Sequence, residues 1–332
     1  MLSGEKILIT GASGLVGMEL ARDLARENEV WGLSRYLDSS ERSGSINAWA
    51  VGRYEVEKLG VRPIAADLLG DLSGVPTDFD FVIHLAITRL PADRLAEAIT
   101  ANSVGGGRIM HHCRSAKAVL VMSSTAVYSF NDDVWHRLKE SDPLGGARPP
   151  FHNPTSPASK LGLEAVAQFC AAEFGLPTTI ARANVVYGER GGLPTRDLHR
   201  VAQGQQLEWF GDPYPHSPIH FDDMRDQIEA LLDAAHVGTT IVNWCGDEVV
   251  TQHEWCRLAA AWSGRELRYQ QIPGAPGNAA DPDIRRSLTG PCRRNFAEAY
   301  REIYDAIESN AESVAHQLRV NKPAKGGLPA TG

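Results

Sequence analysis

Short apolar runs alternate with longer amphipathic stretches through the first half of the chain. Residues 6–10 (KILIT) form a continuously apolar run of the kind that is buried on both faces of a parallel sheet. From Met18 to Glu29, apolar residues recur at helical spacing with charged residues between them. This pattern predicts a buried strand at 6–10 followed by an amphipathic helix over 18–29.

The same alternation continues to about residue 188. Helices are predicted for 92–115 and 157–174, and further strands are predicted for 29–35, 79–87, 118–124 and 177–188. Strand–helix–strand units at this spacing form right-handed crossovers between parallel strands. The sequence therefore predicts an α/β fold with a Rossmann-type, doubly wound parallel sheet.

The pattern changes after about residue 189. A segment rich in Gly, Pro and His (188–218) predicts loops and short elements, and three amphipathic stretches predict helices at 222–235, 251–262 and near 295–308. Thr251 and Glu254 have the spacing of a capping box for the second of these helices.

These patterns suggest a division of the chain into three parts. We expect an NAD(P)-binding Rossmann domain over 1–188 and a smaller C-terminal substrate-binding lobe over 189–318, with exchange of strands and helices between the two. The last residues, 319–332, have no apolar pattern, and a mobile tail is expected there.

Composition and charge exclude several classes of protein. The 332 residues are 43% hydrophobic and 22% charged, and the net charge of −8 argues against a general nucleic-acid binder. No apolar run is long enough for a membrane span, and no signal-peptide pattern precedes the first strand. The cysteines are odd in number and form no metal-binding pair: Cys113, Cys170, Cys245, Cys256 and Cys292. We expect reduced thiols, no metal site and a cytoplasmic protein.

A glycine-rich motif, GASGLVG, follows the first predicted strand and begins the first helix. Glycine at positions 11, 14 and 17 permits a tight turn, close approach of a pyrophosphate and close packing of helix on strand, while the helix N-terminus offers unpaired N–H groups. The strand–turn–helix context makes this a dinucleotide-binding loop. Its predicted cofactor-binding residues are Gly11, Ser13, Gly14, Leu15, Val16 and Gly17.

The end of the second predicted strand indicates which dinucleotide binds. An acidic residue at this point bonds the ribose 2′-hydroxyl of NAD, whereas this chain has Ser34 followed by Arg35. A hydroxyl and a guanidinium suit the 2′-phosphate of NADP. We therefore expect NADP as cofactor, with NAD as the alternative.

From about residue 5 to residue 310 the chain resembles the extended short-chain dehydrogenase/reductase family, the NAD(P)-dependent epimerase/dehydratase group. The resemblance rests on the glycine-rich loop together with several short motifs that are weak one by one and specific in combination. These are ADL (66–68), HLA (84–86), Asn102, SSTAVY (123–128), Lys160 in SPASK, RANVVYG (182–188) and IHFDDM (219–224).

The resemblance implies roles for individual residues. Asp67, with Leu68 beside it, is expected at the adenine, and Ala86 is expected at the nicotinamide ribose, with Leu85 as a further cofactor-binding residue. Lys160 is expected to bind the ribose hydroxyls, and Asn102 also belongs to the implied cofactor site. The implied substrate residues are Ser124, which would hydrogen-bond the reacting oxygen, Thr125, Asn184 and His216.

One catalytic position departs from the family. A tyrosine four residues before the lysine normally serves as general acid and base, but Ser156 stands there, and its hydroxyl is far too weak an acid. Tyr128, Tyr187 or His152 is a candidate replacement, as is a water held by Ser124 and Lys160. Tyr128 is the first candidate, because it follows Ser124 at the end of the same predicted strand.

Three functions remain open at this point. The first is an NADP(H)-dependent oxidoreductase with atypical acid–base chemistry that reduces or isomerises a small polar metabolite. The second is a non-redox lyase or isomerase that uses the nucleotide structurally, and the third is an NADP(H)-binding pseudoenzyme or sensor. The resemblance further implies a homodimer formed through the helices at 92–115 and 157–174.

Overall fold

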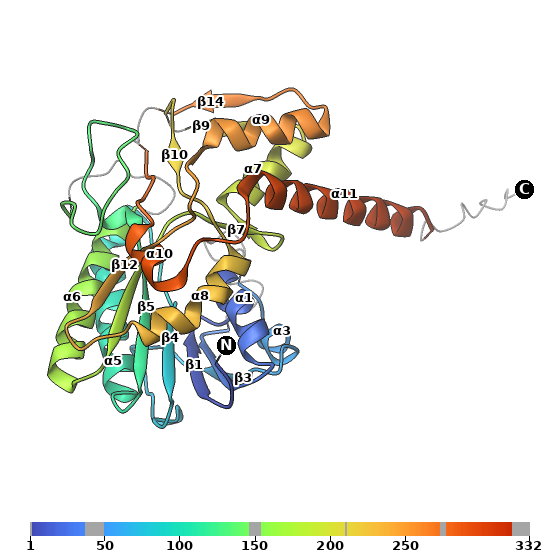
Figure 1. The fold of residues 1–332 in the computed structure, drawn as a ribbon. Coiled ribbons are helices and arrows are strands. Elements are labelled where there is room, and N and C mark those ends of the chain that lie inside the picture. Colours follow the sequence, from blue (N-terminus) through green and yellow to red (C-terminus); the bar gives the residue numbers. More distant parts are fainter. Residues whose placement is uncertain (1, 37–49, 146–153, 210, 273–276, 321–332) are drawn as a thin grey trace, which may run out of the picture.

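The structure is a computed structural model that describes residues 2–36, 50–145, 154–209, 211–272 and 277–320. In this part of the chain the centre of the molecule is a seven-stranded parallel sheet with the strand order β12-β6-β5-β4-β1-β2-β3 (Figure 1). Its strands are β1 Lys6–Thr10, β2 Glu29–Ser34, β3 Arg62–Ala65, β4 Phe81–His84, β5 Ala118–Ser124, β6 Thr178–Ala183 and β12 Thr240–Trp244. The predicted Rossmann-type, doubly wound fold is confirmed.

Helices cover both faces of this sheet. Alternate residues of β1 point to opposite faces, so Ile7 and Ile9 enter one hydrophobic cluster and Leu8 enters the other. The helices are α1 Leu15–Leu24 and α8 Phe221–Asp233 on the first face, and α5 Gly105–His112 and α6 Ser156–Phe174 on the second. A short helix, α3 Arg53–Glu57, precedes β3.

The first helix is displaced from its predicted range of 18–29. It begins at Leu15, directly after its N-cap Gly14, and it ends at Leu24. The side-chain amide of Asn28 donates hydrogen bonds to the carbonyl oxygens of Leu24 and Leu2, which satisfies the end of the helix and turns the chain into β2.

The helical stretch predicted at 92–115 contains several kinds of helix. It runs as η1 Ala92–Arg94, α4 Leu95–Ile99, a π-helical turn η2 Thr100–Val104, and then α5. A π turn carries one additional residue per turn and is frequent at functional sites. Asn102, a predicted cofactor-binding residue, lies within it.

The C-terminal lobe has its own hydrophobic core, which includes Leu198, Trp255 and Tyr300. Its helices are α7 Leu193–Ala202, α9 Gln252–Ser263 and α11 Phe296–Val320, whereas α10 Asp283–Thr289 packs against α8 and β12 of the main sheet. Its short strands are β7 Val186–Gly188, β8 Gly191–Gly192, β9 Leu207–Trp209, β10 Pro215–His216, β11 Ile219–His220, β13 Val250–Thr251 and β14 Tyr269–Gln271. The helix α7 lies where only loops and short elements were expected.

The chain returns from the lobe to the main sheet. After β11, helix α8 packs on the sheet and β12 pairs with β6 in parallel, with Thr240 opposite Thr179. Helix α8 and strand β12 thus belong structurally to the Rossmann sheet, although they follow residue 188 in sequence (Figure 1).

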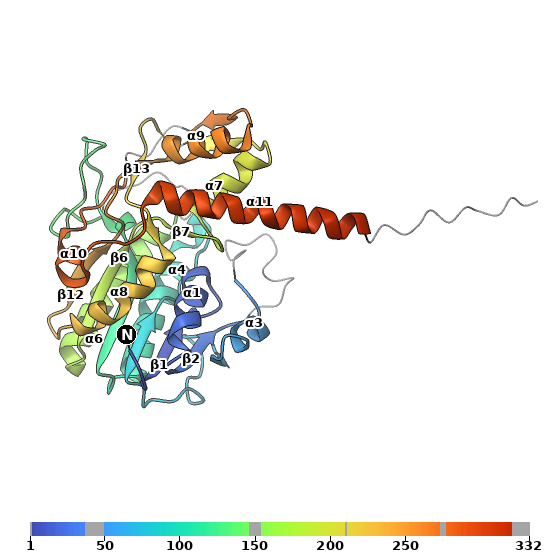
Figure 2. The ribbon, with the colours of Figure 1, turned by 45° about the vertical axis from the view of Figure 1, so that its right-hand side comes forward.

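The lobe helices α9 and α11 lie where helices were predicted, and α11 is longer than predicted. Thr251 caps α9 and forms the expected capping box with Glu254. Helix α11 begins where predicted, packs beside α7 and β7 (Figure 2), and continues to Val320, beyond the predicted end near 308. Most of the expected tail, 321–332, lies outside the described residues.

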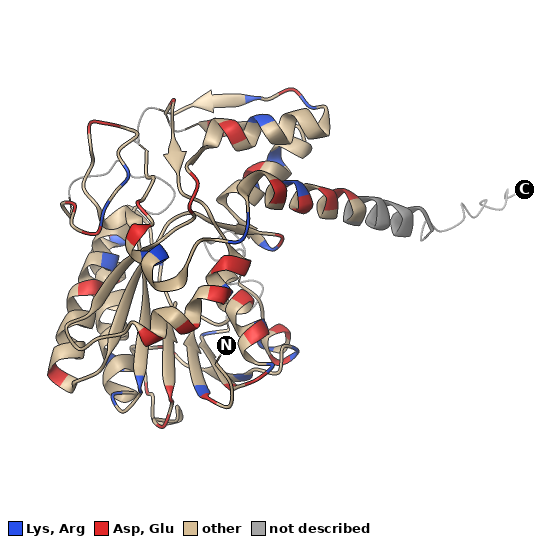
Figure 3. Cartoon of the chain, viewed as in Figure 1, with Lys and Arg blue, Asp and Glu red and all other residues tan. Residues whose placement is uncertain are grey.

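Acidic and basic residues are intermixed along the outer helices and loops in the view of Figure 3, and strands in the middle of the sheet carry few of them. None of the helices in the described ranges is long and apolar enough to cross a membrane.

Candidate functional site

A large pocket opens at the carboxyl ends of the sheet strands, between the sheet and the lobe. Its volume is about 1030 Å³, and it runs from the glycine-rich loop to Ser124 and Lys160 and on to residues of the lobe. Ligands of doubly wound sheets bind at this edge, where the strand order reverses. The pocket is therefore the candidate site.

The glycine-rich loop forms one end of the pocket. Gly14 is the N-cap of α1, and no side chain caps it, so the first N–H groups of the helix face the pocket without a side-chain partner. Gly11 has φ +72°, and a Cβ there would lie 2.9 Å from Ala86 Cα; a Cβ on Gly17 would lie 2.3 Å from Gly11 O. Only glycine fits these two positions, and the geometry suits a bound pyrophosphate.

The pocket's predicted adenosine end contains Ser34, Arg35 and Asp67. The hydroxyl of Ser34 accepts hydrogen bonds from the backbone N–H and the hydroxyl of Ser13, each 3.1 Å long, so Ser34 ties the strand end to the glycine-rich loop. Arg35 is exposed, and no hydrogen bond or ion pair holds its guanidinium in the described part of the chain. Asp67 accepts the N–H of Leu69 and faces the same end of the pocket.

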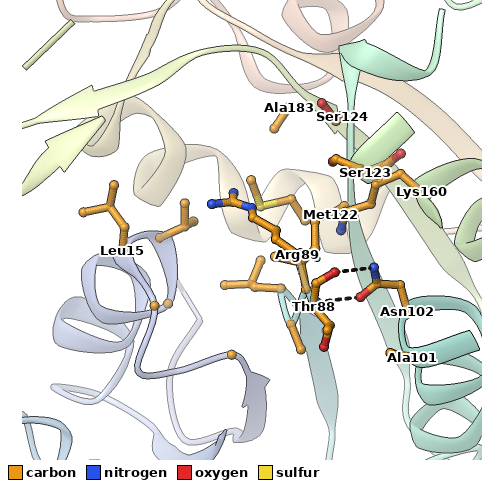
Figure 4. A pocket seen from close by; sticks show the side chains of 18 of the residues that line it. Leu15, Thr88, Arg89, Ala101, Asn102, Met122, Ser123, Ser124, Lys160 and Ala183 are labelled. Carbon is orange, nitrogen blue, oxygen red and sulfur yellow. Dashed lines mark hydrogen bonds between the residues drawn. The ribbon is translucent and has the colours of Figure 1, made fainter. Parts of the chain in front are cut away.

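The loop after β4 is held by two buried side chains. The amide of Asn102 accepts the N–H of Thr88 (2.7 Å) and donates to the carbonyl of Thr88 (2.9 Å), as Figure 4 shows. The hydroxyl of Thr155, just before α6, accepts the N–H of Leu90 and donates to the carbonyl of Leu90. Arg89 lies between Thr88 and Leu90, whose backbone is fixed by these bonds.

Arg89 points into the pocket, away from Asn102 (Figure 4). Its Nε is buried and has no hydrogen-bond partner in the described residues, and burial lowers the pKa of its guanidinium. Sequence analysis missed this residue. Its only signal was its place directly after the buried run of β4, where functional side chains of a doubly wound sheet gather.

Lys160 lies in the same pocket wall, on α6. Its side chain is buried, and its ammonium donates one hydrogen bond, of 2.5 Å, to the carbonyl of Met122. Burial, and next the charge of Arg89, lower the pKa of Lys160 to about 7, although Glu164 acts in the opposite direction.

The carboxylate of Glu164 is occupied on the side of α6 that faces the sheet. Arg182 donates to both of its oxygens at 2.8–3.3 Å, and the hydroxyl of Ser123 donates to it at 2.5 Å. Both members of this ion pair are almost fully buried. Glu164 therefore partly balances Lys160 through space without forming a hydrogen bond to it.

Ser124 faces the pocket from the end of β5. Its oxygen accepts the N–H of Ala126 at 3.1 Å and thereby caps the short helix η3 Thr125–Val127. The hydroxyl hydrogen remains available to donate to an oxygen in the pocket.

The structure brings most of the predicted site residues together in this pocket. They are Gly11, Ser13, Gly14, Leu15, Val16, Gly17, Ser34, Arg35, Asp67, Leu68, Leu85, Ala86, Asn102, Ser124, Lys160 and Asn184. The lobe wall adds further residues, among them Arg196, Tyr214 and Asn278.

Tyr128 does not line the pocket, which corrects its placement as the first catalytic candidate. Its ring is fully buried in a cluster with Val127 and Leu138. Its hydroxyl donates to Asn243 Oδ1 (2.6 Å) and accepts from Arg182 (3.0 Å), and burial raises its pKa well above the usual range.

Thr125 and His216, two predicted substrate residues, also lie outside the pocket lining. The hydroxyl of Thr125 is buried and accepts hydrogen bonds from the amides of Asn184 (3.1 Å) and Asn278 (2.9 Å). His216 is buried and packs between the rings of Tyr214 and Trp255. Each therefore supports the pocket wall from behind.

The other candidate replacement residues for the missing tyrosine are Tyr187 and His152. Tyr187 is buried in the lobe core beside His220 and Phe296, and burial raises its pKa. His152 lies outside the described residues. Ser156 begins α6 one turn before Lys160 and lines the pocket, so the position of the expected tyrosine has no ionisable side chain.

The remaining sequence expectations concern cysteines and metals. All five cysteines are free thiols; Cys292 is partly exposed and the other four are buried. Within the ranges that the structure describes, no group of three or more His, Cys, Asp or Glu side chains has the arrangement of a metal site.

Comparisons with known proteins add to this geometry. The family model described as "NAD dependent epimerase/dehydratase family" matches residues 7–243. A dTDP-4-dehydro-6-deoxy-D-allose reductase of a Streptomyces species is 26% identical over 292 residues, which cover 83% of this chain and 87% of that protein. An uncharacterised UDP-glucose epimerase of Bacillus subtilis is 26% identical over 297 residues, with coverages of 82% and 88%.

A crystal structure of UDP-glucuronic acid 4-epimerase from Bacillus cereus, in complex with NAD, has the same fold. It superposes with a TM-score of 0.76 at 20% sequence identity, covering 92% of this chain and 99% of that one.

Proposed function

We propose that this chain, which belongs to the NAD dependent epimerase/dehydratase family, is an NADP(H)-dependent oxidoreductase that reduces or isomerises a small polar metabolite. The observation that carries the proposal is the continuous pocket from the glycine-rich loop to Ser124 and Lys160. Its volume of about 1030 Å³ is at the upper end of the range for small-molecule and cofactor sites, which supports binding of a dinucleotide together with a second small molecule.

The residues around the pocket match the needs of a dinucleotide. The N-terminus of α1 and its glycines would hold the pyrophosphate, Asp67 would lie at the adenine, and Lys160 would bind the nicotinamide ribose. The bound nicotinamide supplies or accepts hydride. The choice of NADP rests on Arg35, an exposed cation lining the pocket where a carboxylate would select NAD.

For the substrate, a sugar nucleotide is the first class to test. Relatives with matching length carry the names of sugar-nucleotide reductases and epimerases. The lobe wall offers Arg196, Tyr214 and the side-chain oxygen of Asn278 to a polar molecule. Asn184 also lines the pocket, but its amide is fully hydrogen-bonded within the protein. Reduction of a carbonyl is favoured over oxidation of an unactivated alcohol, because Ser156 supplies no base and reduction needs less proton assistance.

Within this proposal, Ser124 donates a hydrogen bond to the reacting oxygen. Its own oxygen is already fixed by the N–H of Ala126, so the hydroxyl hydrogen points elsewhere. A donor held in this way stabilises negative charge that develops on the oxygen during reduction.

The first experiment is titration of the purified protein with NADPH and NADH, by fluorescence or calorimetry. Binding of NADPH, tighter than that of NADH, supports the proposal and justifies a screen of 4-dehydro sugar nucleotides for substrate-dependent loss of nicotinamide absorbance. If neither nucleotide binds, the redox function falls.

A second candidate function is an NADP(H)-binding protein without turnover. It is favoured by Ser156, which leaves the pocket face of α6 without an ionisable group at the usual catalytic position. The same titration followed by the same screen separates the two functions, because a binding protein retains NADPH affinity and shows no turnover with any substrate class. Turnover without a change in nicotinamide absorbance would instead indicate a non-redox lyase or isomerase.

We further propose a homodimer in the cytoplasm. Val104 and Phe169 are exposed on the outer side of the helices η2 and α6, beside a groove lined by Gly107, His111 and Val166. A second copy would cover this apolar face. Phe169→Glu is expected to convert the dimer into a monomer in light scattering, whereas Tyr54→Glu, at an exposed residue of α3, leaves the mass unchanged.

A further inference from the structure

Two cations face the pocket, and no carboxylate hydrogen-bonds to either of them in the described residues. Arg89 lies on the loop after β4, and Lys160 lies on α6. Glu164 is the carboxylate that raises the pKa of Lys160, and its oxygens accept hydrogen bonds from Arg182 and Ser123. Two like charges in a buried wall repel each other, and the repulsion is relieved when one of them loses its proton.

Hydrogen bonds also connect the two chain segments that carry the cations. Thr155, directly before α6, holds the backbone of Leu90, and Asn102 holds Thr88 while also donating to the hydroxyl of Ser159 on α6. The residues next to Arg89 are thus attached to the first turn of the helix that carries Lys160. Buried hydrogen bonds therefore hold the two backbone segments that carry the cations in a fixed relation to each other.

Of these two cations, only Lys160 can release its proton near neutral pH, because the guanidinium of an arginine such as Arg89 stays protonated in proteins. The remaining ionisable neighbours of Lys160 do not compete for this role. His84 on β4 has its pKa lowered to about 3 by burial and then by Lys160, and Glu164 is committed to its ion pair.

We propose that Lys160 is itself the proton donor and acceptor of this site, in place of the missing tyrosine, and that Arg89 is a positioning residue that keeps its amine ready to release a proton. The inference rests on the proposed function and names its acid–base group. Burial and Arg89 together place the pKa of Lys160 at about 7, which is where a general acid or base works best at neutral pH.

The proton balance of a reduction follows directly. A bound reduced nicotinamide would supply hydride to a carbonyl carbon of the substrate. The π pair of that carbonyl would move to its oxygen, and the ammonium of Lys160 would donate a proton to this oxygen. The product is an alcohol, and the lysine is left as a neutral amine that water reprotonates. Ser124 donates a hydrogen bond to the same oxygen while the charge develops.

A measurement on the protein without substrate tests this assignment. Limiting acetic anhydride is applied between pH 5.5 and 10, and acetylation of Lys160 is followed by peptide mass spectrometry, with the exposed Lys139 as internal reference. We expect Lys160 to reach half of its maximal reactivity near pH 7. In Arg89→Gln the midpoint rises by about one pH unit or more, and in Arg89→Lys it stays near the wild-type value.

A purely structural Arg89 would not move this midpoint, so an unchanged midpoint in Arg89→Gln overturns the inference. A wild-type midpoint near that of an ordinary lysine also overturns it. With NADP(H) bound normally, either result leaves the proposed function intact. If Lys160 titrates near pH 7 but no NADP(H) binds, the proposed function falls and the acid–base role falls with it.

Discussion

The hydroxyl of Tyr128 donates a 2.6 Å hydrogen bond to the side-chain oxygen of Asn243, on the strand β12 at the edge of the sheet. Arg182 donates to the same hydroxyl, and the ring is fully buried. Tyr128 thus connects the end of β5 to β12 and turns its hydroxyl away from the pocket.

Tyr128→Phe is therefore expected to lower stability without affecting the site. Loss of the hydroxyl leaves Asn243 Oδ1 without its donor, and the free energy of unfolding should fall by about 1–3 kcal/mol. Denaturant unfolding measures this change, and NADPH affinity and any turnover should equal those of the wild type. A large loss of turnover with unchanged stability would return Tyr128 to the list of catalytic candidates.

Ser156→Tyr should restore the usual acid–base group. Position 156 is one helical turn before Lys160 and faces the pocket, so a phenol there lies beside the amine. We expect substrate-dependent NADPH oxidation to increase by about a hundredfold. The matched control is Ser156→Phe, which has the same bulk without the hydroxyl; equal rates in the two variants would exclude acid–base rescue.

Arg35→Ala should reduce the preference for NADP. If Arg35 binds the 2′-phosphate, its removal weakens NADPH binding by about tenfold and leaves NADH binding nearly unchanged. Calorimetry with both nucleotides measures the change. Arg62→Ala serves as control, because Arg62 is an exposed arginine of β3 that pairs with Glu29 outside the pocket. Equal weakening of both nucleotides would place Arg35 elsewhere on the dinucleotide.

The buried Lys160 also predicts a pH-dependent stability difference. The pKa of Lys160 is about 7 in the folded protein, whereas an unfolded lysine has a pKa of about 10.4. Burying this side chain therefore lowers the free energy of unfolding by its full amount below pH 7. The loss becomes smaller as the pH rises from 7 toward about 10.4. Lys160→Met should therefore stabilise the protein more at pH 6 than at pH 9, by about 2–3 kcal/mol.

Denaturant unfolding of both proteins at the two pH values measures this difference. Because lost packing acts equally at both pH values, it cancels in the comparison. Lys58→Met, at an exposed lysine, should show no such pH dependence. A difference that is the same at pH 6 and pH 9 would mean that Lys160 carries an ordinary charge.

The sequence predicted the strands β1, β2, β4, β5 and β6 and the glycine-rich loop, because a buried strand and a tight phosphate loop are encoded by neighbouring residues. Strands β3 and β12 were not predicted, and the stretch predicted as one strand at 177–188 contains both β6 and β7. It did not predict the direction of Tyr128, because that depends on Arg182 and Asn243, which lie far away in the sequence. Helix α7 was missed for a similar reason. Its Asp197 is buried, and its carboxylate accepts hydrogen bonds from Gln252 and Trp255 of α9, a tertiary contact that the polar sequence conceals.

The direction of the Arg89 side chain could not be predicted from the sequence either. Nothing in the residues around position 89 separates a solvated arginine from one that enters a pocket. The distinction arises from Asn102 in η2 and Thr155 directly before α6, which fix the backbone on each side. Such a residue becomes recognisable only when the three segments are assembled.

The return of the chain to β12 has a consequence for how the protein can be made. During synthesis, the main sheet cannot acquire its last strand until the chain has passed Trp244, after the first part of the lobe has left the ribosome. The pairing of Thr240 with Thr179 is a long-range contact of the kind that slows folding. A fragment that stops at residue 188 would leave β6 as an apolar edge without its neighbour, and such edges recruit other chains. Expression of the Rossmann region alone should therefore give aggregates, and the lobe is best regarded as part of the folding unit.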